Sequence, residues 1–221
     1  MGLTVHHLHL SQSERIPWLC EELGIDYELR LYKRSPLLAP PEYKALHPAG
    51  TAPTIQDGEL TLAESCACME YICHKYGQGR LFLHPSHSDY AGFLYWWHWV
   101  DGTFQPVVMR AMMMRAAGVS DENQFMTITN GRLGKGLMAL DERLRDNEWL
   151  AGAEFTVADL MVVFVLTTFR YFSPYSLQGY DNLLAYLQRI GQRKAYQTAM
   201  KKSDPDMELL LGPDPPKKTL L

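Results

Sequence analysis

The hydrophobic pattern of residues 3 to 31 changes period twice, and this change constrains the fold more than any other feature. An apolar, strand-like stretch runs from Leu3 to Leu10. The next apolar residues recur at helical spacing: Ile16, Leu19, Cys20 and Leu23. Gly24 follows them and suits the left-handed position that ends a helix. From residue 25 to residue 31 apolar and polar residues alternate, as in a half-buried strand. The sequence therefore predicts a βαβ unit.

The next fifty residues extend this pattern. A proline-containing loop leads to a short helix expected near residues 42 to 46. Two short segments, Thr54 to Gln56 and Glu59 to Leu62, flank Asp57-Gly58, a strong hairpin signal. A helix is expected from Ser65 to Tyr76. The order of elements predicts an α/β thioredoxin-like domain with a mixed sheet in residues 1–80.

The pattern becomes entirely helical beyond the linker at residues 77 to 87. Thr156 to Asp159 form a capping box, and the seven residues that follow are all apolar, which predicts a helix buried on every side. We expect an all-α C-terminal domain in residues 88–211, in which the Met and Trp clusters first of all pack. Residues 212–221 are rich in proline and charge, so we expect a loose, flexible tail.

Composition and charge exclude several classes of partner. The chain has 21 Lys and Arg against 25 Asp and Glu, without a run of five like charges, so we expect no nucleic acid and no membrane as partner. Its longest apolar run, Leu160 to Leu166, is too short to span a bilayer, and its first residues do not resemble a signal peptide. The four cysteines lack a secreted framework. These features predict a reduced, cytoplasmic protein with a small ligand.

The histidines near the N-terminus raise the question of a metal site. His6, His7 and His9 lie on one predicted strand, but only His7 and His9 share a face and no third ligand is apparent. We therefore expect no metal. Cys66 and Cys68 are two residues apart on a helix, point in different directions and are interpreted as core residues.

Four short motifs, in this order and at this spacing, resemble those of the cytosolic glutathione transferases, and most closely the serine-type fungal and bacterial members. The motifs are Ser11-Gln12-Ser13-Glu14-Arg15, His47-Pro48-Ala49-Gly50-Thr51-Ala52-Pro53, Leu62-Ala63-Glu64-Ser65 and Phe155-Thr156-Val157-Ala158-Asp159. The resemblance covers nearly the whole chain. It implies a glutathione transferase fold, with glutathione as co-substrate, and a detoxification enzyme that adds the glutathione thiolate to a small apolar electrophile. A glutathione peroxidase side activity would use the same thiolate.

Two of the motifs are expected to hold glutathione. Ala52-Pro53 enters a strand and is a candidate for a cis peptide bond. In the family this proline is cis, and the residue before it pairs its backbone with the cysteinyl unit of glutathione. Glu64-Ser65 stands where a helix begins, which favours an anion, although Ser65 could be a helix cap alone. The family resemblance implies that this pair grips the γ-glutamyl end.

The two serines after the first strand receive different roles. Ser11 closes the strand four residues before Arg15, the spacing at which serine-type transferases place their activating hydroxyl. We expect Ser11 to be the catalytic residue, donating a hydrogen bond to the glutathione thiolate with no histidine partner required. Ser13 is expected to cap the helix that begins at Glu14 or Arg15.

The remaining site residues are implied by the resemblance and by their position. Thr51 accompanies Ala52 and Pro53 in the glutathione site, and Lys44 and His47 are candidates for the glycine carboxylate. In a family-type homodimer, Asp101 is expected to reach the ammonium group of the neighbouring subunit's glutathione. Four side chains of the helical domain are candidates for the electrophile pocket: Phe104, Met109, Tyr171 and Tyr175.

Three alternatives remain open at the level of sequence. The glutathione-dependent isomerase branch carries a double-serine-cysteine signature, which is absent here. A non-catalytic ligand-binding or assembly module could keep the fold, but such modules often lose the hydroxyl and the Glu-Ser pair that this chain retains. A dithiol oxidoreductase is disfavoured because no cysteine lies at the junction of the first strand and helix.

Overall fold

A four-stranded mixed sheet organises the first part of the chain in the computed structural model, which describes residues 2–221. The strand order is β2-β1-β3-β4, with β1 and β2 parallel and the other pairs antiparallel. The strands are β1 (Leu3–Leu8), β2 (Tyr27–Tyr32), β3 (Thr54–Asp57) and β4 (Leu60–Ala63). The predicted βαβ unit and hairpin are both confirmed.

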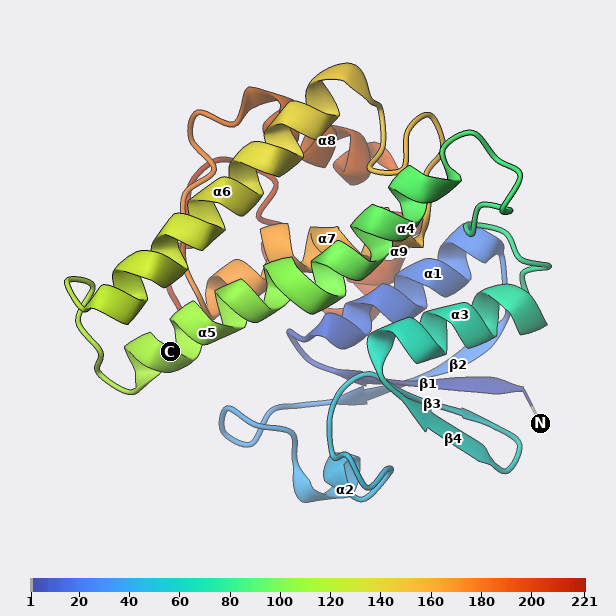
Figure 1. Ribbon diagram of the computed structural model, residues 1–221. Coiled ribbons are helices and arrows are strands. Elements are labelled where there is room, and N and C mark those ends of the chain that lie inside the picture. The colour runs from blue at the N-terminus through green and yellow to red at the C-terminus, as the bar shows by residue number, and fades with distance from the viewer. Residues whose placement is uncertain (1) are drawn as a thin grey trace. The chain divides into compact units, whose positions relative to one another are not determined.

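Helices cover both faces of this sheet (Figure 1). Helices α1 (Arg15–Leu23) and α3 (Ser65–Lys75) lie on one face, and the short α2 (Pro41–Lys44) lies on the other. Strand β1 is central, so both of its faces are largely buried. Because side chains alternate along a strand, Leu8 packs against Tyr43 of α2, whereas His7 points to the opposite face.

Helix α1 ends as its sequence predicts. Gly24 adopts φ 65° and ψ 37°, and its N–H bonds back to the last turn of the helix. A residue with a Cβ would be strained in this left-handed conformation. The chain can therefore turn directly into β2, which places β2 parallel to β1.

Residues 190–208 belong to the same compact unit as residues up to Phe82, although they are distant in sequence. Their helix α9 (Lys194–Ser203) packs against α1. The rings of Trp18 and Tyr196 meet edge to face at 4.8 Å, and Arg193 forms a bidentate ion pair with Glu22 at 2.7 Å. The first compact unit thus includes a C-terminal helix that the sequence pattern assigns to the helical domain.

The second compact unit comprises residues 83–189 and 209–221 and is helical, which confirms the expected fold class. Its elements are α4 (Tyr90–Trp99), η2 (Val100–Phe104), α5 (Gln105–Ala116), α6 (Gln124–Asp146), α7 (Val157–Leu166), η3 (Thr168–Tyr171) and most of α8 (Asp181–Gln192). Every residue of α7 is buried, as its apolar sequence predicts. The Thr156–Asp159 capping box that opens α7 is also present.

A buried arginine binds the backbone at the start of residues 212–221, the segment for which a loose tail was expected. Arg170 is fully buried and donates hydrogen bonds to the carbonyl oxygens of Gly212 at 3.0 Å, Pro213 at 2.9 Å and Asp214. Leu220 N–H also donates to the Tyr171 carbonyl. Backbone carbonyls offer hydrogen-bond acceptors in any sequence, so these contacts do not depend on the composition of the segment.

Candidate functional site

Ser11 lies at the turn that leaves β1 and is 5% exposed. Leu10 takes a positive φ of 50°, and Ser11 is extended and caps the 3₁₀ turn η1 (Gln12–Glu14). Its Oγ accepts a hydrogen bond from Ser13 N–H at 3.2 Å. An accepting hydroxyl keeps its own hydrogen for another partner, so this geometry is compatible with a donor role for Ser11.

The structure corrects the role expected for Ser13. The cap of η1 is Ser11, and α1 begins after Glu14 without a side-chain cap. Ser13 is fully buried, and its Oγ instead contacts His7 Nδ1 at 2.9 Å and accepts from Leu8 N–H at 3.0 Å. The expectation failed because η1 intervenes between β1 and α1 and moves the capping position two residues upstream.

The loop before β3 lies beside this turn. Its Ala52-Pro53 peptide bond is cis, as predicted. A second cis bond, Ser35-Pro36, was not predicted. The side-chain amide of Gln12, the neighbour of Ser11, donates to the Ala52 carbonyl at 2.7 Å. Pro53 is buried, Ala52 is half-buried and Thr51 is exposed. This hydrogen bond therefore brings the Ser11 turn and the cis-proline loop together.

The N-terminus of α3 forms a third part of the candidate site. Glu64 is exposed and holds φ 76° and ψ 128°, an unusual conformation for a residue with a Cβ that costs on the order of 1–3 kcal/mol. Ser65 is 5% exposed and accepts a hydrogen bond from Arg15 Nη1 at 3.0 Å. Because guanidinium groups only donate, the Ser65 hydrogen stays available for an acceptor such as a carboxylate.

Arg15 is the residue of this site that sequence reasoning did not assign. It is the first residue of α1 and is 1% exposed. Such a buried arginine places a permanent positive charge beside Ser65 and the positive end of the α3 dipole. The sequence signal that could have identified Arg15 is its position next to the apolar stripe of α1. A charged residue at such a position is buried and therefore needs polar partners.

The two candidates for the glycine carboxylate, Lys44 and His47, precede the cis Ala52-Pro53 bond in sequence. Lys44 is exposed at the end of α2. His47 is half-buried, and its Nδ1 accepts from Ala49 N–H at 3.1 Å. With Nδ1 accepting, the neutral ring carries its hydrogen on Nε2, where it can donate to an anion.

Three of the four cysteines lie in an environment that keeps their thiols unreactive. Cys20, Cys68 and Cys73 are fully buried, which confirms the interpretation of Cys68 as a core residue; Cys66 is only half-buried, so the same interpretation is wrong for Cys66. Burial is the main factor that raises the pKa of the Cys68 thiol, and that of the Cys73 thiol, to about 12. Thiols with such pKa values are not nucleophiles near neutral pH.

The helical unit contains a cavity of about 390 Å³. Phe104 lines it and stacks on Trp99 with ring centroids 5.0 Å apart. Gly136 allows this close packing, because a Cβ at that position would lie 2.8 Å from the Phe104 ring. Three basic side chains also line the cavity: Arg110, Arg132 and Lys135.

The other residues predicted for the electrophile site are placed differently. Met109, Tyr171 and Tyr175 do not line the Phe104 cavity. Met109 is 40% exposed on α5, and Tyr171 is half-buried. The Tyr175 hydroxyl donates to the Val165 carbonyl at 2.6 Å, and burial raises the pKa of Tyr175. Asp101 is exposed on η2.

The part of the chain that the structure describes offers neither a metal-binding cluster nor a membrane-spanning helix. Within residues 2–221, no group of three or more His, Cys, Asp or Glu side chains is arranged to hold a metal ion. None of the helices in the same range has the length and apolar character needed to cross a bilayer.

The sequence and the structure both match known proteins. Residues 11–75 match the N-terminal domain of glutathione S-transferases, and residues 96–194 match their C-terminal domain. Glutathione S-transferase 3 of Schizosaccharomyces pombe is 30% identical over 216 residues, covering 90% of this chain and 87% of that protein. Glutathione S-transferase GstA of Escherichia coli is 24% identical over 165 residues, covering 72% of this chain and 77% of that protein.

Solved structures agree with these matches. A glutathione S-transferase from Actinobacillus pleuropneumoniae superposes with a TM-score of 0.80 and 31% identity, covering 91% of this chain and 93% of that one. The theta class glutathione S-transferase of Xanthomonas axonopodis pv. citri, solved with glutathione bound, superposes with a TM-score of 0.69 and 25% identity, covering 90% of this chain and 96% of that one. The motifs, the fold and these relatives agree, and the chain belongs to the glutathione S-transferase family.

Proposed function

We propose that this protein adds the thiolate of glutathione to small, soft, apolar electrophiles and that Ser11 activates the thiol. The observation that carries the proposal is the linkage of three segments within one compact unit. Gln12 joins the Ser11 turn to Ala52, and Arg15 joins the start of α1 to Ser65. A peptide that lies along the cis-proline loop would have Ser11 and the start of α3 as neighbours.

The proposed chemistry requires a thiolate. A free cysteine-type thiol has a pKa of about 8.5 and is only about 3% ionised at pH 7. One hydrogen bond to the charged sulfur stabilises it by about 1.5–3 kcal/mol, which lowers the pKa by roughly 1–2. The hydroxyl of Ser11 is buried and already accepts from Ser13 N–H, so its hydrogen can point to the sulfur. Serine donates here and does not attack.

The γ-glutamyl end would bind at the start of α3. Ser65 keeps a hydrogen for the carboxylate, while Arg15 and the helix N-terminus supply positive potential. The exposed Glu64 carboxylate would face the ammonium group. Thr51, Ala52 and Pro53 would hold the cysteinyl backbone, and Lys44 with His47 would hold the glycine carboxylate.

The helical domain, residues 88–211 in this proposal, would build the electrophile pocket and most of a homodimer interface, leaving residues 1–80 to bind glutathione. Phe104 is the best-supported pocket residue because it lines the cavity, whereas Met109, Tyr171 and Tyr175 rest on their sequence position. We further propose a twofold homodimer in which Asp101 reaches the partner's glutathione ammonium. A detoxification role in the cytoplasm and a hydroperoxide reductase side activity complete the proposal.

Two assays on the purified chain test it. Retention on glutathione-agarose followed by conjugation of chlorodinitrobenzene identifies an enzyme. Retention without conjugation would identify a silent binding module, and failure to bind would overturn the proposal. Light scattering checks the dimer, since a species of 25.3 kDa at micromolar concentration would rule out a homodimer.

A further inference from the structure

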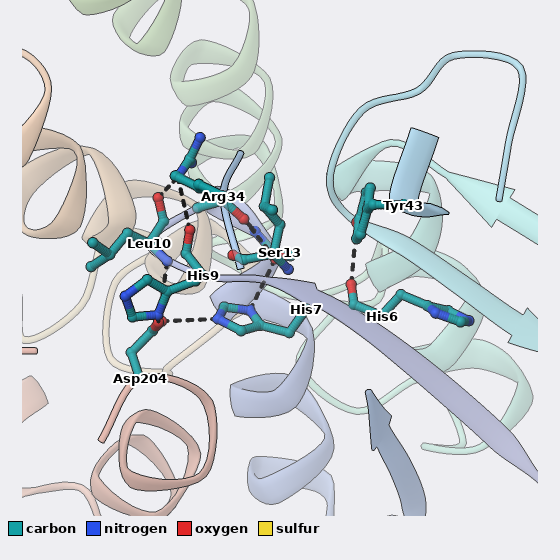
Figure 2. A network of polar contacts seen from close by, with 10 residues as sticks. His6, His7, His9, Leu10, Ser13, Arg34, Tyr43 and Asp204 are labelled. Carbon is teal, nitrogen blue, oxygen red and sulfur yellow. Dashed lines mark hydrogen bonds and ion pairs between the residues drawn. The ribbon is translucent and has the colours of Figure 1, made fainter. Parts of the chain in front are cut away.

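A line of buried side chains runs inward from Ser11. Ser11 Oγ lies 2.7 Å from Ser13 Oγ, which lies 2.9 Å from His7 Nδ1, and His7 Nε2 lies 2.9 Å from Asp204 Oδ2. Figure 2 shows the inner part of this line, from Ser13 through His7 to Asp204 at the end of α9. The last three residues are at most 2% exposed. All four belong to one compact unit.

The hydroxyl of Ser13 restricts how hydrogens are arranged along this line. A hydroxyl has one hydrogen and two lone pairs. Leu8 N–H can only donate to it, at 3.0 Å, so Ser13 Oγ has one lone pair and one hydrogen left for Ser11 and His7. The Leu8 carbonyl is a poorer acceptor at 3.4 Å. Two arrangements satisfy the three shorter contacts, and they differ in the protonation state of His7.

In the first arrangement His7 is neutral, with its hydrogen on Nε2 and donated to Asp204. Ser13 then donates to Nδ1, and Ser11 donates to Ser13. The outward lone pair of Ser11 can accept a hydrogen bond from a thiol S–H.

In the second arrangement His7 is an imidazolium and donates to both Asp204 and Ser13. Ser13 then donates to Ser11, whose second lone pair is already filled by Ser13 N–H at 3.2 Å. The hydrogen of Ser11 therefore points outward and can donate to a thiolate. The first arrangement therefore suits a bound thiol, and the second suits a bound thiolate.

We propose that His7, held by Asp204, receives the thiol proton of glutathione through Ser13 and Ser11. This inference rests on the proposed function. The S–H bond breaks and an O–H bond forms on Ser11, the original Ser11 proton moves to Ser13, and the original Ser13 proton moves to His7 Nδ1. The products are a thiolate and an imidazolium, with no proton gained or lost. After conjugation the proton returns along the same path to the product or to water.

Positive groups around Asp204 keep its carboxyl ionised, as the acceptor of the His7 Nε2 hydrogen must be. Burial alone would raise the pKa of Asp204, but the hydrogen bond from His7 and the charges of His7 and His9 lower it below the ordinary range. Its Oδ1 also accepts from Leu10 N–H at 3.1 Å and is paired with His9 Nδ1. Arg34, which binds the carbonyls of His9 and Leu10, adds a further positive charge.

Counting protons tests the relay. Calorimetry in two buffers of different ionisation enthalpy gives the protons released when glutathione binds near pH 6.5, and ultraviolet absorbance gives the thiolate formed. The relay predicts thiolate with almost no proton release in the wild type. In Ser13→Ala the relay is interrupted, so each thiolate should be accompanied by about one released proton. Ser13→Thr, which keeps the hydroxyl, should restore wild-type behaviour.

A matched histidine pair gives a second readout. His7→Gln should lower conjugation near pH 6.5 by about ten-fold or more and shift the pH profile to higher pH. His6→Gln should change neither, because buried His6 lies on the same strand but bonds to Tyr32 and Gln56 instead of Ser13.

The outcomes are distinguishable. Wild-type protein that releases about one proton per thiolate would overturn the relay whether or not the variants fold. An unchanged pH profile in folded His7→Gln would also overturn it. Wild-type protein that does not bind glutathione, or binds it without forming thiolate, would overturn the proposed function and the relay together.

Discussion

The side-chain amide of Gln12 donates a 2.7 Å hydrogen bond to the carbonyl oxygen of Ala52, which is 40 positions away in sequence. This bond joins the turn that carries Ser11 to the loop that enters β3. It links the neighbour of the proposed thiol-activating residue, Ser11, to the proposed backbone site for the cysteinyl unit. Loss of this hydrogen bond should weaken glutathione binding more than it lowers the stability of the fold.

Gln12→Ala should weaken glutathione binding by roughly 2- to 10-fold, the equivalent of one net hydrogen bond of about 0.5–1.5 kcal/mol. Isothermal titration calorimetry measures the dissociation constant. Gln197→Ala is the matched control, because the Gln197 amide also donates to a carbonyl at 2.7 Å, that of Gly191, away from the candidate site. Equal affinities for Gln12→Ala and the wild type would contradict this prediction.

Arg170→Met should lower the free energy of unfolding by roughly 3–5 kcal/mol, because several carbonyls would lose a charged donor. The affected acceptors are the carbonyl oxygens of Tyr175, Leu210, Gly212, Pro213 and Asp214. Urea denaturation measures the loss, and limited proteolysis should cut sooner within residues 209–214. Arg145→Met, at an exposed position on α6, serves as control. Unchanged stability and proteolysis in Arg170→Met would show that Arg170 does not hold these residues.

The ionisation of buried Asp159 should lower the free energy of unfolding as the pH rises. Burial raises the pKa of Asp159 from about 3.8 to about 6 and outweighs the hydrogen bonds from Leu150 and Thr156, which lower it. The folded pKa lies above the unfolded pKa, so this contribution is complete below about pH 4 and is lost as pH rises through 6.

The wild type should therefore lose roughly 3 kcal/mol of unfolding free energy relative to Asp159→Asn between about pH 4 and 6. Denaturant titrations across this range measure the difference. Asp146→Asn, at an exposed position, should show no such divergence from the wild type. Parallel curves for the wild type and Asp159→Asn would refute the assignment.

Much of the architecture follows from local sequence. The change from a two-residue to a 3.6-residue period, with Gly24 at the end of α1, predicted the βαβ unit because each signal acts within a few residues. The capping box at Thr156 and the cis bond at Ala52-Pro53 were also predictable from short motifs. In these places local conformational preference and tertiary structure agree.

The hydrogen-bond network behind Ser11 was not predictable in the same way. Ser13 appeared to be a cap because it is polar and precedes a helix, but its partner is His7, whose ring is held by Asp204, 197 residues away. No periodic pattern connects positions so distant in sequence. The packing of α9 on α1, which brings Asp204 to β1, likewise depends on tertiary contacts such as that of Trp18 with Tyr196.

Arg15 and the C-terminal residues show a related limit. Composition predicts a loose tail for residues 212–221, but it does not reveal that Arg170 binds the backbone carbonyls of Gly212 and Pro213. Arg15 is buried because Ser65 and its surroundings accept its hydrogen bonds, and a single sequence does not show which acceptors will be near.

The account depends most on Ser11 as the donor to the glutathione thiolate, and the pKa of the bound thiol tests it most directly. Titration of thiolate absorbance in the glutathione complex should give a thiol pKa about 1–2 higher in Ser11→Ala than in the wild type, through loss of one charged hydrogen bond. Conjugation near pH 6.5 should fall about ten-fold or more, glutathione affinity should change little, and Ser11→Thr should retain the low pKa. Identical thiol titrations in the wild type and Ser11→Ala would contradict the account.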